Sequence, residues 1–593
     1  MLTLCGLSDR SMRVRLLMIA VAATALVALN VRAASAAATV LYVDRNNPSC
    51  SDAGSGTSAQ PFCTIKPAAS LATAGQTVQV ASGTYPELVT VSNSGSPGSP
   101  IVFTAAPGAS VTVSGQANGF KLAGKSYVTI QGFTVANTTS YGFYVSSSSS
   151  NVTISGNTVS NTASNGIYVT TLSTNVTVSG NTVSGVNGVG IYVNTLSNIT
   201  VSGNTVSDTT SYGIYNRSSS NVTISGNHVS GAQSHAIYVS PSSSNVTVND
   251  NQVSGINGYG VWANSSSGVT VSGNTISNTS SYGLHVDTSS NVTVSGNDVS
   301  FAGQRAVDLI KYGIKLTDTT ASLVSGNVSH DNSNDGIFLD ATTNGVRVTG
   351  NQAFRNARGY ARAAPGIDVR GYNNTVDRNI SHDNEDSGFQ FYTGSHDNLV
   401  VDNLAYFNGD HGIDDLGSTN QRIISNTVWG NYAAGINVEG SSTGATVENN
   451  IAVDNGHNVS PCFTPPCNSR TRGNIRVDST STTGTTVNYN LVYLTTPDTM
   501  YVWGSTSYTS QKDFQGATGQ ESHGDEADPI WVSPGVDFHL QAGSPAIDSA
   551  DSGVSGEAST DLEYHGRVDD PNTRDTGAGP RRYDDRGAYE FQP

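Results

Sequence analysis

The chain has 593 residues, of which only 12% are charged, and its formal net charge is −17. This length exceeds one ordinary globular core, and the composition argues against helix bundles, coiled coils and acidic disordered tails. The negative balance argues against a nucleic-acid partner, because binding phosphates requires clustered Lys and Arg.

The first 36 residues have the pattern of a secretory signal peptide. Two arginines precede an apolar run over residues 16–29, and a small-residue step at 34–36 resembles a signal-peptidase site. The run is short for a bilayer span. We therefore expect a secreted, extracellular protein that has no membrane partner once the signal is removed; the alternative is a retained N-terminal anchor.

Four further cysteines fit an oxidising compartment. Cys50 and Cys63 flank a Gly/Ser-rich loop, and Cys462 and Cys467 flank a Phe-Thr-Pro-Pro segment. Two local disulfides are expected, with free thiols as the alternative. Metal ligation by cysteine is not expected, because the sequence contains no Cys-X-X-Cys or Cys/His cluster.

An internal repeat organises residues 125–494. The pattern Asn-Val-Thr-Val-Ser-Gly-Asn begins at Asn151 and recurs every 23 or 24 residues as far as Asn291, and degenerate copies continue to Gly484. A fixed period in the twenties predicts a solenoid, and the leucine ladder of leucine-rich repeats is missing. We predict an all-β, single-stranded parallel β-helix. Its stacked coils would bury Val, Ile and Leu, with an Asn ladder at a left-handed corner.

The ends of the chain differ from the repeat in composition. Residues 37–124 should form an N-terminal cap with a short helix at 65–71 and the first coils, and residues 495–593 a C-terminal capping segment. Three insertions lengthen the late coils, near 301–311, near 358–364 and in the loop between the two late cysteines. Long insertions on one side of a solenoid often build the walls of a binding site.

Several motifs resemble known β-helix proteins. Residues 41–44 with 61–65 resemble the start of secreted right-handed parallel β-helix enzymes that act on polysaccharides, including calcium-dependent pectate lyases. The endings at 543–548 and 585–590 are similar to those of many bacterial β-helix proteins, and 384–417 resemble mannuronan epimerases. The resemblance implies a right-handed coil and the polysaccharide-active group, while the motifs themselves are mainly scaffold.

One outward-facing column of side chains changes character along the repeat. Residues two beyond the glycine of each Gly-Ile-X-Val run should point outward, because alternate strand residues face opposite sides. From Tyr144 to Trp262 the column is aromatic, and it either binds a glycan or protects the sheet. Residues 301–593 carry 37 acids and 19 bases, against 7 and 5 in 38–300, which indicates a site in the late coils or merely polar, solvated coils. The late column comprises Lys315, Phe338, Asp368, Gln390, Asp414, Asn437 and Arg476, and the next outward column comprises Thr317, Asp340, Arg370, Tyr392, Leu416, Glu439 and Asp478.

Two acidic clusters, at 383–386 and 410–415, point to a metal. Asp386 and Asp410 both stand two residues before a glycine, so they should stack and repel unless a cation lies between them. We predict Ca²⁺ held by Asp386, Asp410 and Asp414, because calcium takes oxygen ligands; solvated turn acids are the alternative. The run 408–414 resembles the calcium motif of one pectate-lyase family, with His411 in place of one Asp.

The resemblance implies a calcium-assisted polysaccharide lyase that cleaves a pectin-like, uronic-acid-containing glycan by β-elimination. Arg370 is the expected base or carboxylate clamp, and Lys315 stands in a Gly-Ile-Lys-Leu run similar to the base motif of that family. Two alternatives remain: a glycoside hydrolase using Asp414 and Glu439 on adjacent coils, or a non-catalytic glycan-binding solenoid. We expect a monomer with an extracellular polysaccharide as partner. The further catalytic candidates are Asp368 and Tyr392, and the substrate-binding candidates are Gln390, His411, Asn437 and Arg476.

Overall fold

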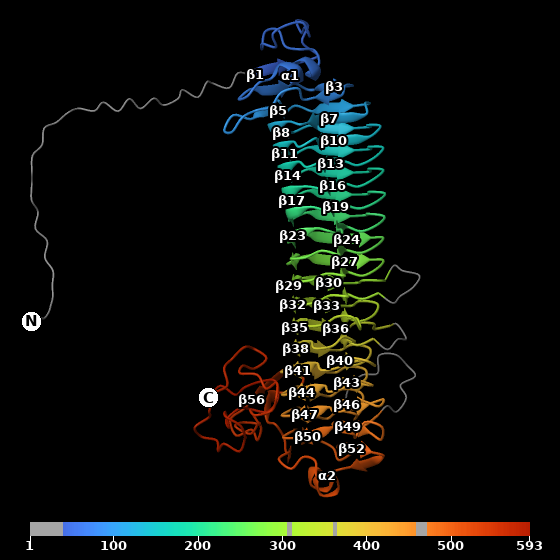
Figure 1. Cartoon of the computed structure of the whole chain (residues 1–593), viewed down its shortest axis with the longest axis vertical. Coiled ribbons are helices and arrows are strands. Elements are labelled where there is room, and N and C mark those ends of the chain that lie inside the picture. Colours follow the sequence, from blue (N-terminus) through green and yellow to red (C-terminus); the bar gives the residue numbers. More distant parts are fainter. Residues whose placement is uncertain (1–39, 305–310, 360–363, 458–470) are drawn as a thin grey trace, which may run out of the picture. The chain divides into compact units, whose positions relative to one another are not determined.

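The computed structural model describes residues 40–304, 311–359, 364–457 and 471–593. These residues form the predicted right-handed parallel β-helix, and Figure 1 shows the strands of successive coils stacked along one axis. The predicted signal peptide and the Cys462/Cys467 pair lie outside the described residues. The other predicted disulfide, Cys50–Cys63, is present.

Each coil contributes one strand to each of three parallel sheets. In one coil these strands are β11 (Ser150–Ser155), β12 (Thr158–Ser160) and β13 (Ile167–Thr170). The next coil repeats them as β14 (Thr174–Ser179), β15 (Thr182–Ser184) and β16 (Ile191–Asn194), in parallel register. We call these the first, second and third sheets. The first sheet runs from β1 (Val40–Val43) to β50 (Thr486–Asn488), and the second from β3 (Gly83–Tyr85) to β54 (Asp525–Glu526).

The third sheet carries the predicted site. Its inward-facing residues are mostly apolar and fully buried, as Ile314 and Leu316 are in one strand and Ile367 and Val369 in another; Asn216 and Asp415 are polar exceptions. The residue between each pair is therefore held on the outer face. The strands of this sheet are β4 (Val89–Thr90), β7 (Asn118–Ala123), β10 (Tyr141–Ser146), β13, β16, β19 (Ile214–Arg217), β22 (Ile237–Val239), β25 (Val261–Asn264), β28 (Leu284–Asp287), β31 (Ile314–Thr317), β34 (Ile337–Leu339), β37 (Ile367–Val369), β40 (Phe389–Phe391), β43 (Ile413–Leu416), β46 (Ile436–Glu439), β49 (Ile475–Asp478), β52 (Tyr501–Gly504) and the antiparallel β53 (Thr506–Tyr508).

The predicted asparagine ladder is present at two corners of the coil. The first Asn of each repeat takes the left-handed conformation, with φ of 52° at Asn175. The second Asn of each repeat, which follows a glycine in most coils and Asp250 in the coil of Asn251, is buried. Asn251 Nδ2 donates to the carbonyl of Ile224 and to Asn274 Oδ1, both at 2.9 Å. These amides link the coils at positions where the backbone turns, so they satisfy buried groups that no strand pairs. The buried ladder comprises Asn157, Asn181, Asn204, Asn227, Asn251, Asn274, Asn297, Asn327, Asn351, Asn379, Asn403, Asn426, Asn450 and Asn490.

Removing one rung of the buried ladder should destabilise the coil. In Asn251→Ala, the Asn227 amide and the Ile224 carbonyl lose partners that the Asn251 side chain holds at 2.9 Å. Because buried groups without partners carry their full desolvation penalty, we expect a loss of about 3 kcal/mol in unfolding free energy, measured by chemical denaturation. Asn257→Ala, at an exposed position of the same coil, should change stability by less than about 0.5 kcal/mol. Equal effects of the two variants would contradict a structural role for the ladder.

Two helices lie at the ends of the coil stack. Helix α1 (Ile65–Leu71), as predicted, buries Ile65 and Ala68 in the first apolar coils. Helix α2 (Gln511–Thr518) begins at the N-cap Ser510 and ends at Gly519, whose φ of 74° suits a glycine. Its Phe514 stacks on Tyr501 at a ring-centroid distance of 4.2 Å and covers the last coil. Among the described residues, no helix is long and apolar enough to cross a bilayer.

The residues after β54 fold back along the coils. The sequence predicts a C-terminal capping segment but not this return. Figure 1 shows this segment beside the strands β38 (Thr375–Asp377) to β50. It contains the hairpin of β55 (Trp531–Ser533) and β56 (Asp537–Leu540). Apolar side chains on the outer face of the second sheet and from this segment form a second buried cluster, which explains why the chain returns. The cluster comprises Leu404, Ile451, Val453, Leu491, Trp531, Phe538, Leu540, Ala546, Ile547, Leu562, Ala588 and Tyr589.

A buried ion-pair network joins the same two parts of the chain. The guanidinium of Arg567 lies 2.9 Å from Asp402, 3.1 Å from Glu557 and 3.0 Å from Glu590. None of these four side chains is more than 1% exposed. Asp402 belongs to the coils and the other three to the returning segment, so the network fixes how this segment docks.

Candidate functional site on the third sheet

The structure places the predicted late column in register on the outer face of the third sheet. Lys315 pairs with Phe338 and Phe338 with Asp368, so these residues lie on consecutive coils. The register continues through the four following coils without a shift. The remaining pairs are Asp368 with Gln390, Gln390 with Asp414, Asp414 with Asn437 and Asn437 with Arg476.

Two cations converge over the ring of Phe338. The Nζ atom of Lys315 is 5.7 Å and the guanidinium carbon of Arg370 is 4.9 Å from the centroid of that ring. Lys315 also lies 4.7 Å from the ring of Tyr282 and donates a 3.4 Å hydrogen bond to its hydroxyl. On the other side, Arg370 is 4.6 Å from the ring of Tyr392, which is 38% exposed. These contacts are the ones that cations make with aromatic faces.

Arg370 is held in place by the fully buried Asp368. Its Nε and Nη2 atoms donate to the same carboxylate oxygen at 3.0 and 2.8 Å. Burial opposes the charge of Arg370, but the charge and hydrogen bonds of Asp368, together with the charge of Asp335, raise the pKa of the guanidinium. Burial also raises the pKa of Asp368 to about 6, although Arg370 lowers it. Arg370 therefore stays charged, and 37% of its side chain remains exposed.

Farther along the sheet, Asp414 is held by two amides. Gln390 Nε2 donates to one of its oxygens at 3.1 Å and Asn437 Nδ2 to the other at 2.8 Å. Arg476 then donates to Asn437 Oδ1 and to Glu439, each at 2.6 Å. Burial raises the pKa of Asp414; the charge of Glu439 adds to this shift and His411 opposes it.

The three predicted metal ligands lie on two adjacent coils. Asp386 and Asp410 stack on adjacent coils, and the amide of Asp410 donates to the carbonyl of Asp386 at 3.3 Å. Burial, then the charge of Asp410 and a hydrogen bond between the two carboxyl groups, raise the pKa of Asp386 well above its usual range. Asp414 lies near Asp410, because His411 Nδ1 is 3.5 Å from Asp410 Oδ1 and 3.8 Å from Asp414 Oδ1. Within the described residues, the set of acidic side chains that meets a metal-site distance lies elsewhere, in the C-terminal segment. Calcium at Asp386, Asp410 and Asp414 stays a prediction.

Asp415, assigned to the same acidic cluster by sequence, lies inside the coil. It pairs in register with Phe391 and Val438, which are both fully buried. Its carboxyl group accepts hydrogen bonds from Ser418 and Ser442. Because it faces the core, this residue belongs to the scaffold and takes no part in the outer site.

The buried Asp415 makes a testable contribution to pH dependence. Burial raises its pKa to about 7, so the folded chain holds a proton that the unfolded chain releases near pH 4. Stability should therefore fall as pH rises from about 4 to 7, by about 4 kcal/mol from this group. Asp415→Asn removes this contribution, so its unfolding free energy relative to the wild type should rise across that range. A constant difference between the two proteins at pH 4.5 and 8 would contradict the assignment.

The early aromatic column is a ladder of stacked rings. Successive rings from Tyr168 to Trp262 lie 4.4 to 5.0 Å apart with interplanar angles of 4° to 14°. Their faces are buried against one another, so only ring edges remain for a ligand, whereas a sugar ring packs on an exposed aromatic face. The structure therefore favours the protective role over the glycan-binding role.

The sequence reasoning missed two features of this face. His285 continues the aromatic column, stacked on Trp262 at 6.2 Å and paired in register with Lys315. Burial, followed by the charge of Lys315, lowers the pKa of His285 to about 3. A second column of aromatic rings stands one residue before the glycine, or before Ala236 in the coil of His235, and reaches Phe338 through Tyr312. Both columns could be predicted from the sequence by counting residues from the start of each Gly-Ile-X-Val run. The second column comprises Tyr212, His235, Tyr259, Tyr282 and Tyr312.

Asp335 was also missed. It is buried in the turn before β34, and burial followed by the charge of Asp368 raises its pKa well above the usual range. Like His411, it stands immediately before the glycine of its coil. The residue before the glycine of each late coil can therefore add a polar group beside the outward column of the third sheet, as Asp335 and His411 do.

Comparisons with known proteins agree with this architecture. A right-handed β-helix region model matches residues 184–299 and 212–363, and a Pel9A-like right-handed β-helix model matches residues 41–212. A model described as periplasmic copper-binding protein (NosD) matches residues 308–471. An uncharacterised Bacillus subtilis protein, YwoF, is 36% identical over 125 residues, which is 18% of this chain and 26% of that protein. The chain thus spans about a quarter of the length of this relative.

Solved structures are similar at low identity. The A-module of the Azotobacter vinelandii mannuronan C-5 epimerase AlgE4 is 18% identical, covering 58% of this chain and 88% of its own, with a TM-score of 0.33. A lacto-N-biosidase from Eubacterium ramulus is 13% identical, covering 62% and 64%, with a TM-score of 0.25. At such identity the likeness concerns the fold alone. The matched models and the observed coils identify this chain as a right-handed parallel β-helix protein.

Proposed function

We propose that this chain is a secreted, monomeric polysaccharide lyase that cleaves a uronic-acid-containing glycan by β-elimination. The observation that carries the proposal is the convergence of Lys315 and Arg370 over Phe338. β-Elimination from a uronate needs a fixed positive charge for the carboxylate and a separate base for the neighbouring proton. These two residues offer both at one point of the outer face.

Arg370 acts as the carboxylate clamp in this proposal, not as the base. Its pairing with Asp368 keeps the guanidinium charged and fixes its direction. A guanidinium binds carboxylates well because its planar fork matches their geometry. Asp368 thus positions Arg370, and Tyr392 covers the far side of the guanidinium, where it would contact the sugar.

Lys315 is the proposed proton acceptor. Its described partners are aromatic rings and one hydroxyl, with no carboxylate among the described ion pairs. The neutral amine would remove the C5 proton of the clamped uronate. The released electron pair forms the C4–C5 double bond as the bond from C4 to O4 breaks, and O4 leaves with a proton taken from solvent.

Other predicted residues have supporting roles in the same proposal. Asp386 and Asp410 suit calcium because they offer only oxygen ligands and lie on adjacent coils. Bound calcium would neutralise a uronate carboxylate and so acidify its C5 proton. Along the sheet, Arg476 adds a third cation, which favours a polyanionic chain lying across several coils. Gln390, His411, Asn437 and Arg476 are the proposed substrate-binding residues.

The test is incubation of the protein with a panel of uronate and neutral polysaccharides, with and without EDTA. A lyase releases unsaturated products that absorb in the near ultraviolet, and calcium assistance predicts that EDTA reduces this signal. Reducing ends without that absorbance would instead support hydrolysis by Asp414 and Glu439, which lie on adjacent coils. Binding without product would support a glycan-binding solenoid, and either of these results would overturn the lyase proposal.

A further inference from the structure

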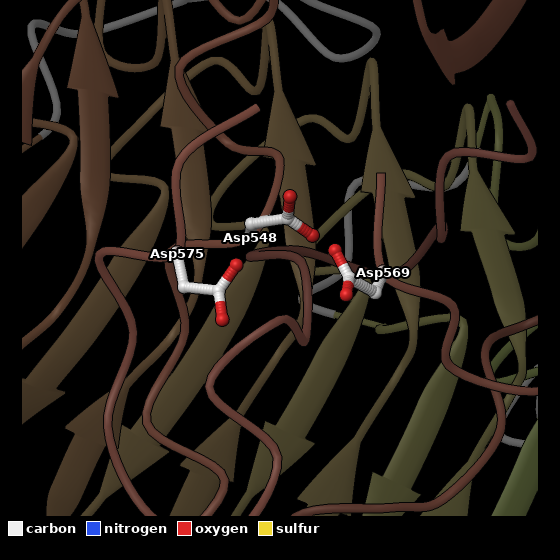
Figure 2. A group of neighbouring side chains, drawn as sticks. All are labelled: Asp548, Asp569 and Asp575. Atoms are coloured by element: carbon white, nitrogen blue, oxygen red, sulfur yellow. The ribbon is translucent and has the colours of Figure 1, made fainter. Parts of the chain in front are cut away.

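Three carboxylates meet in the C-terminal segment, away from the third sheet. Asp548, Asp569 and Asp575 each offer an oxygen, and these oxygens all lie within 4.8 Å of one another. Figure 2 shows the carboxylates of Asp569 and Asp575 directed toward Asp548 from opposite sides. Asp569 and Asp575 are exposed and Asp548 is fully buried.

Asp548 carries an unpaired oxygen. Its Oδ2 atom is buried and has no hydrogen-bond partner among the described residues. Its Oδ1 accepts only a long contact of 3.4 Å from the amide of Asp570. A buried carboxylate oxygen without a partner is costly, so such an atom in a native fold indicates a missing ligand. In the described ranges, none of the three carboxylates forms an ion pair with Lys, Arg or His.

The backbone holds Asp548 in a fixed orientation. Its amide donates to Asp585 Oδ1 at 2.8 Å, and its carbonyl accepts from the amides of Thr576 at 2.8 Å and Gly577 at 3.1 Å. The loop that carries Asp569 and Asp575 is therefore tied to the turn at Asp548 on the peptide side. The carboxylates of Asp548, Asp569 and Asp575 face one another on the opposite side of this turn, so three negative charges lie close together there.

We propose that Asp548, Asp569 and Asp575 bind a calcium ion that joins the loop of residues 569–577 to the buried turn at Asp548. Oxygen ligands without His or Cys exclude the pattern of a zinc site. Three carboxylates suit calcium better than magnesium, which keeps several waters and usually takes one or two carboxylates. The site is structural, because it lies outside the outer face of the third sheet.

The ion would strengthen docking of the returning segment. Ala546 and Ile547 precede Asp548 directly and belong to the apolar cluster that covers the second sheet. Asp585, which accepts from the Asp548 amide, also accepts from the Phe591 amide at 2.6 Å. An ion bound at Asp548 would therefore hold together the turn at Asp548, the loop of residues 569–577 and the stretch around Asp585. An ion that binds only the folded state stabilises that state.

The test is calcium titration of the full chain by calorimetry after treatment with EDTA and buffer exchange. The double variant Asp569→Asn/Asp575→Asn changes two exposed side chains, so it should fold. The matched control is Asp208→Asn/Asp250→Asn, which changes two exposed aspartates on the coils. We expect the first variant to lose one bound calcium per chain, or to bind it at least about tenfold more weakly, while the control keeps it. Magnesium chloride should give a weaker signal.

A second measurement follows docking directly. In wild type and control, calcium should raise the temperature at which a protease begins to cleave residues 530–593, and in the Asp569→Asn/Asp575→Asn variant this shift should be absent. Equal calcium binding by this variant and wild type, or no binding by wild type at millimolar calcium, would overturn the proposal. Because the readout is binding and proteolysis, a failed lyase assay leaves it unaffected.

Discussion

Replacing Arg567 with alanine is expected to destabilise the docked C-terminal segment by about 3–5 kcal/mol. The change leaves the carboxyl groups of Asp402, Glu557 and Glu590 facing one another without their shared cation. A buried charge without its partner is far more costly than the pair is stabilising, because water cannot replace the lost contact. The expected readout is release of residues 530–593, detected by limited proteolysis and by a lower midpoint of denaturation.

The loss from Arg567→Ala should depend on pH in a defined direction. Burial raises the pKa of Asp402 and of Glu557, and raises that of Glu590 to about 7, even with the guanidinium present. Without Arg567 these groups can avoid repulsion by binding protons, so the variant should lose less stability at pH 5 than at pH 8.

Arg422→Ala is the matched control for this prediction. Arg422 also joins the coils to the returning segment, by a 3.2 Å hydrogen bond to Ser555, but it is partly exposed. Exposed polar contacts contribute little, so we expect a change below about 1 kcal/mol. If Arg422→Ala and Arg567→Ala release the segment equally, burial of the network is not what holds it.

On a uronate polysaccharide that the protein cleaves, Lys315→Met and Arg370→Ala should each reduce kcat/KM by about 10²–10⁴-fold. Lys315→Met keeps the length of the side chain and removes the amine, so kcat should fall with little change in KM. Arg370→Ala removes the proposed clamp for the substrate carboxylate, so both kcat and KM should deteriorate. The measurement is the initial rate of unsaturated product, followed by near-ultraviolet absorbance.

A conservative variant and a remote one complete this prediction. Arg370→Lys keeps the charge but loses the second contact to Asp368, so it should recover only part of the activity. Arg217→Ala removes an exposed arginine from β19 on the same sheet and should leave activity unchanged. Full activity of Lys315→Met would show that another residue is the base. Full activity of Arg370→Ala would show that Arg370 does not bind the substrate carboxylate.

The repeat made the coil and its outer columns predictable from sequence. A period of 23 or 24 residues fixes which side chains lie above one another, since each coil pairs with the next in parallel register. Lys315, Asp368 and Asp414 were placed on one face for this reason, and the register confirms that placement. The inward direction of Asp415 follows from the same alternation, because it stands one residue beyond an outward one.

By itself, then, the sequence determined the parallel β-helix, its coil boundaries, helix α1 and the face that carries the polar residues, because these depend on contacts that repeat at a constant spacing. Only the tertiary structure decided which atoms meet on that face: amides bind both oxygens of Asp414, and Asp368 binds Arg370. Only the structure placed the returning segment, its network at Arg567 and the three carboxylates around Asp548. These contacts join residues at irregular separations, and no period in the sequence encodes them.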